Sequence, residues 1–484
     1  MPQYIQYGSH ILDSPREECG LIGIYTRDTE SLGRRCFFGL FTLQHRGQES
    51  AGIAVTDGQT IYHHKGMGLV TQVFTEDNVA ELTGTIGIGH VRYSTTGSTT
   101  LRNAQPILGN FRGMPFALAH NGNLINAAPL RREIEQGGIV LSSTSDSELI
   151  VKLIEISEHT DFTEALLAAL QRIQGAYALV IMTPDRLIGL RDPWGIRPLV
   201  IGRAEGDDYV LASETCALGL LGTRFVREVE PGEMVTIHDG ELRAERAERY
   251  VTDALCVFEF IYFARPDSRM YGRVLYESRR SMGHMLAQEH PVNADLVIGI
   301  PDTGIPGAIG YAEAARIPFA HGLVKNRYIQ RTFIQPDQRM REMGVRMKLA
   351  PLPDVLQGKR VVVVDDSIVR GTTTGPQVQL LRDAGAAEVH LRICAPPIKY
   401  PCFYGIDMAN QKELIASRMT VPELERHLGP DSLGYQSIPS LVRALGIPRN
   451  RFCLACFDGR YPCPIPEDIK VTKFALEEAV SGAE

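Results

Sequence analysis

The segment KRVVVVDDSIVRGTTTG, at residues 359–375, constrains the fold of this chain more than any other feature. Its four consecutive valines form a strand that is apolar on both faces, and such a strand is buried only in a sheet that is covered on both sides. A loop of glycine and small hydroxyl residues follows, and then the helical pattern PQVQLLRDAGA. A similar strand–turn–helix unit begins near Asp295. We therefore predict a doubly wound parallel sheet with a ligand site at the carboxyl ends of its strands.

The rest of the chain has other patterns. Through about residue 250, short apolar runs alternate with Gly, Asn and Asp turns, which predicts layered sheets with a few helices. After residue 411 the segment TVPELERHLG predicts a helix with Thr420 as its N-cap and Gly429 past its end. Because 484 residues exceed what one core usually supports, we expect two domains, at 19–250 and 251–410, and a helical tail at 411–484.

Composition and charge exclude several classes of protein. Lys and Arg number 50 against 57 Asp and Glu, and this net charge of −7 gives no electrostatic reason to expect nucleic-acid binding. The first eighteen residues contain no apolar run of signal-peptide length, so we expect no membrane insertion and a cytoplasmic protein. In such a chain the nine cysteines indicate a nucleophile, metal ligands and buried thiols rather than disulfides.

The motif VVVVDDSIVRGTTT resembles the PRPP-binding motif of type I phosphoribosyltransferases, where PRPP is 5-phosphoribosyl-1-pyrophosphate. The resemblance implies that Asp365 and Asp366 face the ribose diol and a magnesium ion. It also implies that the loop wraps the 5-phosphate, because its amides and hydroxyls suit an anion. The loop residues are Ser367, Gly371, Thr372, Thr373 and Thr374. The alternative interpretation is a generic strand-to-helix turn with two solvated acids.

Cations are expected to close over the departing pyrophosphate. The segment KNRYIQRTF supplies Lys325, Arg327 and Arg331 as a lid, although it can also be interpreted as a solvated basic loop. Relatives commonly carry glycine where this lid has Gln330, a change that stiffens the segment. Thr303 lies in the turn PDTG, which resembles the family's pyrophosphate loop, and is expected to complete the magnesium site.

Five ordered blocks in the N-terminal half resemble the glutaminase domain of the N-terminal-nucleophile amidotransferases: EECGLIGIY, HRGQESAGI, GHVRYSTTG, HNGNLIN and SDSE. The resemblance implies a four-layer αββα fold with Cys19 as the nucleophile. In that family the cysteine is residue one, because its own amine accepts the thiol proton. We therefore expect residues 1–18 to be a propeptide cut between Glu18 and Cys19. The released amine has a reference pKa of roughly 7.7 to 8.0, suited to this work.

The same resemblance assigns the other glutaminase residues. Arg92 would hold the α-carboxylate of glutamine and Asp146 its α-ammonium group. Asn121 and the amide of Gly122 would form the oxyanion hole. Taken singly, Cys19 is better interpreted as a buried thiol, Asn121 as a turn residue and Asp146 as a helix cap, so the assignment depends on the ordered set.

Further blocks, including RDPWGIRPL, ASETCAL, EFIYFARPDS and VKNRY, extend the resemblance to the glutamine PRPP amidotransferase family over nearly the whole chain. This resemblance implies transfer of ammonia from glutamine to PRPP through a channel, giving phosphoribosylamine in the first committed step of purine biosynthesis. It also implies a homotetramer inhibited by purine nucleotides. One rival is a PRPP-sensing regulator, but no basic recognition helix is evident. Another is a different amidotransferase with this N-terminal domain, but neither an SGG-type loop nor sugar-isomerase repeats are found.

The motif CLACF places Cys453 and Cys456 with two residues between them, in a turn-sized chelate. By resemblance to the cluster-containing branch of the family, Cys256 and Cys402 would complete the ligands of a structural [4Fe-4S] cluster. Structural zinc and metal-free buried thiols are the alternatives. Four cysteines do not match ligand positions, and two of them, Cys36 and Cys216, are expected in the core. The other two are Cys394 and Cys463.

Overall fold

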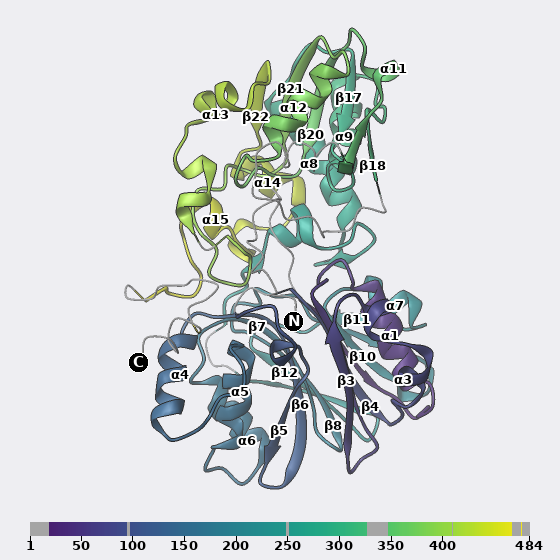
Figure 1. Ribbon diagram of the computed structural model, residues 1–484, viewed down its shortest axis with the longest axis vertical. Helices are drawn as coiled ribbons and strands as arrows, with labels where there is room; N and C mark the ends of the chain where they lie inside the picture. Colours follow the sequence, from purple (N-terminus) through teal and green to yellow (C-terminus); the bar gives the residue numbers. More distant parts are fainter. Residues whose placement is uncertain are drawn as a thin grey trace, which may run out of the picture.

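The chain folds into two lobes (Figure 1), and the computed structural model describes residues 19–93, 97–247, 251–326, 347–408, 410–466 and 476. The lower lobe in Figure 1 contains β1 to β13, and the upper lobe contains β17 to β22. The expected propeptide and the lid residues Arg327, Gln330 and Arg331 lie outside the described residues.

Two antiparallel sheets pack face to face in the lower lobe, and their facing sides bury residues such as Leu21, Ile88 and Val180. The first sheet has the order β11-β9-β10-β1-β4-β2-β3 and the second β13-β12-β8-β7-β6-β5. The first comprises β1 (Gly20–Tyr25), β2 (Ser50–Thr56), β3 (Ile61–Met67), β4 (Ile86–Arg92), β9 (Val200–Arg203), β10 (Tyr209–Ala212) and β11 (Arg224–Glu228). The second comprises β5 (Ile107–Phe111), β6 (Met114–Leu124), β7 (Gly175–Met182), β8 (Arg186–Arg191), β12 (Glu233–His238) and β13 (Glu241–Arg246).

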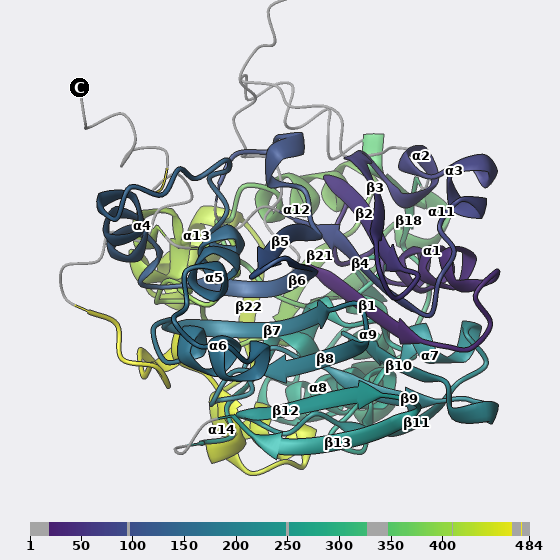
Figure 2. The same cartoon turned by 90° about the horizontal axis from the view of Figure 1, so that it is seen from below.

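Helices cover the outer face of each sheet (Figure 2), which gives the predicted four-layer αββα arrangement. The helix α1 buries Leu32, Cys36 and Leu40 against the first sheet. Cys36 is therefore a core residue as expected, whereas Cys216 is only half-buried because it begins a short helix at the edge of this core. The helices are α1 (Leu32–Thr42), α2 (Val70–Val73), α3 (Glu76–Ala80), α4 (Ala127–Gln136), α5 (Asp146–Glu155), α6 (Phe162–Leu170) and α7 (Cys216–Leu220).

A parallel sheet of order β17-β20-β21-β22 forms the upper lobe and confirms the predicted fold class. The valines at 361–364 are fully buried because both faces of β20 are covered. Its strands are β17 (Leu296–Gly299), β20 (Arg360–Asp365), β21 (Glu388–Ile393) and β22 (Ser432–Tyr435). The helix α9 packs on β17 and β20, and α12 contacts β21. The lobe's helices are α8 (Leu275–Glu289), α9 (Gly304–Ala315), α11 (Pro353–Leu356) and α12 (Thr374–Asp383).

The tail contains the expected helices but is not wholly helical, because β22 extends the parallel sheet and β23 (Phe452–Cys453) pairs with β14 (Leu255–Cys256). Thr420 forms a capping box at the start of α13, and Gly429 ends it in the left-handed conformation, as predicted. The tail helices are α13 (Val421–Leu428), α14 (Ile438–Leu445) and α15 (Ala455–Asp458). Within the described ranges, no helix has the length and apolar character needed to cross a membrane.

Candidate active sites

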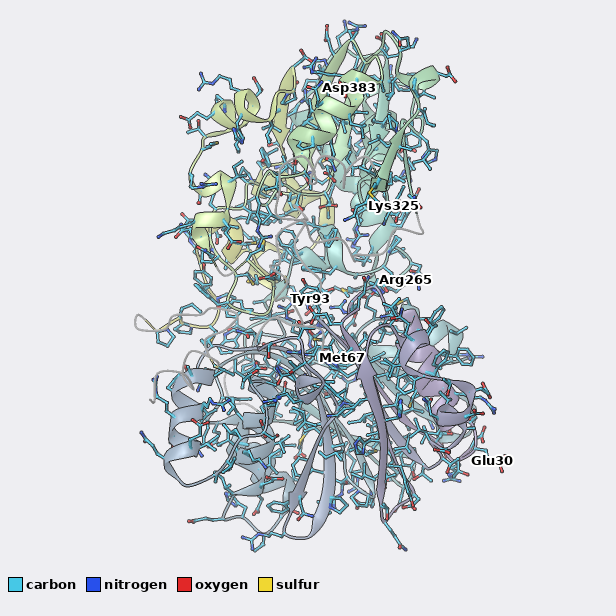
Figure 3. The ribbon with its side chains drawn as sticks, viewed as in Figure 1. Glu30, Met67, Tyr93, Arg265, Lys325 and Asp383 are labelled. Carbon is cyan, nitrogen blue, oxygen red and sulfur yellow. The ribbon has the colours of Figure 1, made fainter. Side chains whose placement is uncertain are left out.

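Cys19 directly precedes β1 and lies against the segment that follows β4. Its thiol donates a hydrogen bond to the carbonyl of Tyr93 (Sγ to O, 3.5 Å), and Figure 3 shows Tyr93 at the junction of the two lobes. Only 8% of Cys19 is exposed. Burial raises the pKa of the thiol to about 11, although the nearby charge of Arg92 opposes this effect. The thiol is therefore protonated at neutral pH and needs a base before it can act as a nucleophile.

Two buried groups of opposite charge flank this thiol. Arg92 ends β4 and donates from Nη1 to the carbonyl of Ser98 (3.2 Å). Asp146 is the first residue of α5, and its Oδ2 accepts a hydrogen bond from the backbone N–H of Leu124 (2.9 Å). Both side chains act electrostatically on the Cys19 thiol, so both lie near it. A guanidinium and a carboxylate in this arrangement suit a ligand that carries both a carboxylate and an ammonium group.

Asn121 and Gly122 are adjacent on β6 and provide hydrogen-bond donors inside the lobe. The side-chain Nδ2 of Asn121 is buried and makes no hydrogen bond within the described part of the chain. A buried donor without a protein partner is available to an accepting ligand, and pairing it with one is favourable. Gly122 has a φ of 151°, and a Cβ there would lie 2.0 Å from the carbonyl oxygen of Ala176. Only glycine fits this position.

The two predicted loops of the upper lobe meet at the carboxyl edge of the parallel sheet. Thr303, the N-cap of α9, donates from its hydroxyl to Oδ2 of Asp366. Oδ1 of Asp366 accepts from the hydroxyl of Ser367 (2.6 Å), and the backbone N–H of Asp366 donates to Oδ1 of Asp365 (2.8 Å). This cluster of carboxylate and hydroxyl oxygens has the donor chemistry that magnesium prefers.

The loop after β20 has the features of an anion site. Gly371 has a φ of 73°, and a Cβ there would lie 2.5 Å from Cδ1 of Ile415. The hydroxyl of Thr372 is buried and has no hydrogen-bond partner among the described residues. Thr373 is the N-cap of α12, which begins at Thr374. The loop therefore places the N-terminus of α12 and the hydroxyl of Thr372 close together in the sequence, an arrangement that favours binding of a phosphate.

Lys325 is the only predicted lid cation that lies within the described ranges. It ends β18 (Leu323–Lys325), which pairs with β19 (Leu349–Pro351), and Figure 3 shows it in the upper lobe. Its Nζ lies 2.7 Å from Oδ2 of Asp302, and both side chains are largely exposed. Asp302 directly precedes Thr303, so this ion pair brings the cation to the loop that contacts Asp366.

The four predicted cluster cysteines line one small cavity with a volume of about 10 Å³. Burial raises the pKa of the Cys453 thiol to about 12 and holds those of Cys256 and Cys456 well above the ordinary value. Cys402 is the fourth, and neither Cys394 nor Cys463 lines the cavity. Among the described His, Cys, Asp and Glu side chains, no group of three or more is placed to hold a single metal ion.

Sequence reasoning did not single out the buried charges at the lobe junction. Arg46, Glu214 and Glu259 have fully buried side chains, and Arg46 contacts both glutamates. The available signal was a charged residue inside each of three otherwise recognised blocks, HRGQESAGI, ASETCAL and EFIYFARPDS. Since burial of a charge requires a partner, such residues predict a buried ion pair, but the sequence does not identify the partners.

Comparisons with known proteins agree with this architecture. A family model described as a glutamine amidotransferase domain matches residues 90–219. The amidophosphoribosyltransferase of Synechococcus elongatus is 52% identical over 470 residues, which cover 96% of this chain and 95% of that protein. The amidophosphoribosyltransferase of Bacillus subtilis is 48% identical over 459 residues, covering 93% of this chain and 95% of that protein.

Two solved structures have nearly the same fold over their whole length. One, described as the allosteric regulatory enzyme of purine biosynthesis, superposes with a TM-score of 0.90 at 46% identity, covering 94% of this chain and 99% of the other. The second is the glutamine PRPP amidotransferase of Bacillus subtilis in complex with ADP and GMP. Its TM-score is 0.88 at 47% identity, with 93% and 99% of the two chains covered.

Proposed function

The chain belongs to the amidophosphoribosyltransferase family, whose members transfer the amide nitrogen of glutamine to PRPP in the first step of purine biosynthesis, and we propose how its residues divide this work. Glutaminase chemistry takes place around Cys19 in the lower lobe. Phosphoribosyl transfer takes place at the loops of Thr303 and Asp366 in the upper lobe. The domains extend over 19–250 and 251–410, and the tail over 411–484 contributes β22 to the second domain's sheet.

In the glutaminase half, the α-amine freed by removal of residues 1–18 takes the proton from Sγ of Cys19. The thiolate attacks the amide carbon of glutamine, which Arg92 and Asp146 hold by its carboxylate and ammonium groups. The nitrogen leaves as ammonia after it receives the proton back from the amine, and water then hydrolyses the thioester to give glutamate. The thiol pKa of about 11 supports this route, because such a thiol needs a dedicated base.

The oxyanion of the tetrahedral intermediate is stabilised by Nδ2 of Asn121 and the backbone N–H of Gly122. The observation that carries this proposal is the buried side-chain amide of Asn121, which has no partner among the described residues. A donor that has no protein partner in the described residues can pair with the oxyanion as negative charge develops. It is therefore worth more in the transition state than in the ground state.

Replacing Asn121 with alanine is expected to lower the kcat of glutamine hydrolysis by about 10²–10³-fold, the usual cost of one oxyanion donor. Synthesis of phosphoribosylamine from free ammonia should continue, because it bypasses this site. Asn126→Ala is the matched control, since Asn126 belongs to the same HNGNLIN block but donates to the carbonyl of Arg172. Glutamate release and ammonia-driven synthesis are assayed in parallel. Equal rates of glutamate release in the two variants would rule out the oxyanion role.

The propeptide proposal predicts that active enzyme begins at Cys19. Intact mass measurement and N-terminal sequencing of purified protein should show loss of residues 1–18, beside a PRPP-dependent assay of glutamate release. Uncleaved protein should lack glutaminase activity, because an acylated nitrogen cannot accept the thiol proton. Fully active enzyme that begins at Met1 would disprove the proposal.

In the phosphoribosyl half, Asp365, Asp366 and Thr303 would hold Mg²⁺, which when bound would neutralise negative charge on the pyrophosphate. The nitrogen of ammonia attacks C1 of the ribose as the bond to pyrophosphate breaks, and a proton then leaves the new amine. The protein's part is to position the substrate and exclude water. The 5-phosphate is bound by Ser367, Gly371, Thr372, Thr373 and Thr374, and the departing pyrophosphate by Lys325, Arg327 and Arg331.

A [4Fe-4S] cluster held by four cysteines is the third part of the proposal. The chemistry of the cavity supports it, because three separated segments each supply sulfur to the lining of one small cavity. These segments are the linker strand β14, the loop at Cys402 and the tail from β23 into α15. The role of the cluster is structural, since it would fasten the tail to the linker between the lobes.

Replacing Cys453 with serine is expected to remove iron and acid-labile sulfide and to lower the melting temperature by about 5 °C or more, as loss of a structural metal centre does. Cys463→Ser serves as the control, because Cys463 is also buried in the tail but does not line the cavity. Iron, sulfide and zinc are quantified with thermal unfolding. Zinc in place of iron, or iron retained after Cys453→Ser, would contradict the cluster.

Regulation and assembly complete the proposal. The Bacillus subtilis enzyme was solved with ADP and GMP, which supports purine nucleotides as feedback inhibitors of this chain too. The assembly is a homotetramer, which analytical ultracentrifugation would test. None of the nine cysteines forms a disulfide, which supports a reducing compartment such as the cytoplasm.

A further inference from the structure

A buried network of charges joins the two lobes. Arg46, in the loop between α1 and β2, donates from Nη2 and Nη1 to the two carboxylate oxygens of Glu259 (2.7 and 3.0 Å). Nη1 also donates to Oε1 of Glu214 (2.6 Å), and none of these three side chains is exposed. Glu214 in turn accepts from the backbone N–H of Arg265 (2.9 Å), and Figure 3 shows Arg265 at the junction. The fork of a guanidinium on a carboxylate fixes direction as well as distance.

The same guanidinium also holds the proposed nucleophile. Nε of Arg46 donates to the backbone carbonyl of Cys19 (3.1 Å). That carbonyl is bonded to the Cα that carries both the amine and the thiol-bearing side chain, so fixing it fixes the two reacting groups together. Every donor-bearing nitrogen of the Arg46 side chain is thus committed to Cys19, Glu214 or Glu259. A contact of this kind limits the positions that the nucleophile can take.

Glu259 belongs to the segment that leads into the upper lobe. It begins the π-helical turn Glu259–Phe263, and such turns are frequent at functional sites. Buried Arg279, on α8, clamps this turn by donating to the carbonyls of Phe260 (2.9 Å) and Ala264 (2.6 Å). Burial lowers the pKa of Arg279, and the strongest opposing influence is the carboxylate of Asp366. The turn that carries Glu259 is therefore anchored next to the proposed PRPP loop.

From these contacts we infer that Glu259 is a positioning residue for glutamine hydrolysis, which acts through Arg46 on the carbonyl of Cys19. The glutaminase site is then completed by a side chain from outside its own two sheets. This inference rests on the proposed role of Cys19 as nucleophile. The physical reason is that a buried guanidinium keeps its orientation only while its carboxylate partners are in place, and small misplacement of a nucleophile is costly.

The test is Glu259→Gln in the full-length enzyme. Glutamine retains the shape and one oxygen acceptor but loses the charge, and Glu214 still neutralises Arg46. We expect the kcat of glutamine hydrolysis to fall by about 10–10²-fold, the cost of misplacing a reacting group. The KM for glutamine should change less than about 3-fold, because Arg92 and Asp146 bind the substrate. Ammonia-driven synthesis should stay within about 2-fold, which also reports correct folding.

Glu313→Gln is the matched control. Glu313 accepts from Nε and Nη2 of Arg280 (both 2.9 Å), so it too forms a forked pair in the upper lobe, but at the surface. It should leave both activities unchanged. Should Glu259→Gln not fold, the shorter Glu259→Asp, which keeps the charge but cannot span the same distance, is expected to show the same selective loss.

A double-mutant cycle tests the route through Arg46. If Glu259 acts only through Arg46, the double variant R46K/E259Q should be no slower than the slower single variant. Independent, multiplying losses would overturn the inference, as would an unchanged kcat in E259Q or an equal fall of the ammonia-driven activity. The variant Cys19→Ala separates this outcome from failure of the proposed function. If Cys19→Ala still hydrolyses glutamine, Cys19 is not the nucleophile and the proposed function fails. If Cys19→Ala is inactive but E259Q hydrolyses glutamine normally, only the positioning role of Glu259 is disproved.

Discussion

Replacing Cys19 with alanine abolishes ammonia release from glutamine and leaves synthesis from free ammonia intact. The expected loss is at least about 10³-fold, because the thiolate forms the covalent intermediate and no other group in the site can replace it. The side chain is small and 8% exposed, so its truncation removes one sulfur atom and little packing. Glutamate release and phosphoribosylamine formation are measured with glutamine and then with ammonium salt at alkaline pH, where free ammonia is available.

The control for this variant is Cys36→Ala, because Cys36 is a fully buried thiol of the same lobe that packs between α1 and the first sheet. It should retain both activities. Burial raises the pKa of Cys36 to about 12, so it is not a competing nucleophile. If Cys19→Ala still hydrolysed glutamine, the proposal that the glutaminase reaction takes place at Cys19 in the lower lobe would be wrong.

Replacing Asp366 with asparagine produces the opposite result: synthesis fails with either nitrogen source. We expect a loss of about 10²–10³-fold, since Asp366 links the loops of Thr303 and Ser367 and supplies charge for the metal. Glutamate release measured without PRPP should equal that of the unaltered enzyme, because the glutaminase residues lie in the other lobe. The two variants together therefore separate the half-reactions.

Asp383→Asn is the control for the second variant. Asp383 ends α12, the helix that begins at the phosphate loop, and Figure 3 shows it high in the upper lobe, away from Lys325. Its carboxylate accepts from Nε2 of Gln379 (2.7 Å) at the surface. Both activities should persist in Asp383→Asn. Ammonia-driven synthesis that survives Asp366→Asn would exclude the proposed PRPP site, and isothermal titration with PRPP provides an independent measurement.

Local patterns predicted the elements that are fixed by local chemistry. The valine run at 361–364 favoured a strand because valine is β-branched, and four apolar residues in sequence are all buried in a strand only when both of its faces are covered. The helix at 421–428 was predicted with its ends, since Thr420 and Gly429 perform capping functions that depend on a few neighbouring atoms. The contact between the hydroxyl of Thr303 and Asp366 follows from the same logic, because parallel strands end at one edge.

Contacts between distant segments could not be predicted in this way. The pairing of Arg46 with Glu259 depends on how the lobes dock, and no periodicity of either segment encodes it. The strand β22 has only four residues, and a run of that length is compatible with several structures until a neighbouring strand supplies hydrogen bonds. Resemblance identified the cavity cysteines, whereas spacing alone connected only Cys453 with Cys456.

The parallel pairing of β14 with β23 determines when the chain can complete its folding. Cys256 pairs with Cys453, so these two strands cannot pair until nearly all of the polypeptide has been synthesised. The first lobe uses only earlier residues for its two sheets and can assemble while synthesis continues. The strands β14 and β23 both contribute sulfur ligands, so an inorganic centre that needs Cys256 and Cys453 together is completed only after the tail has been made.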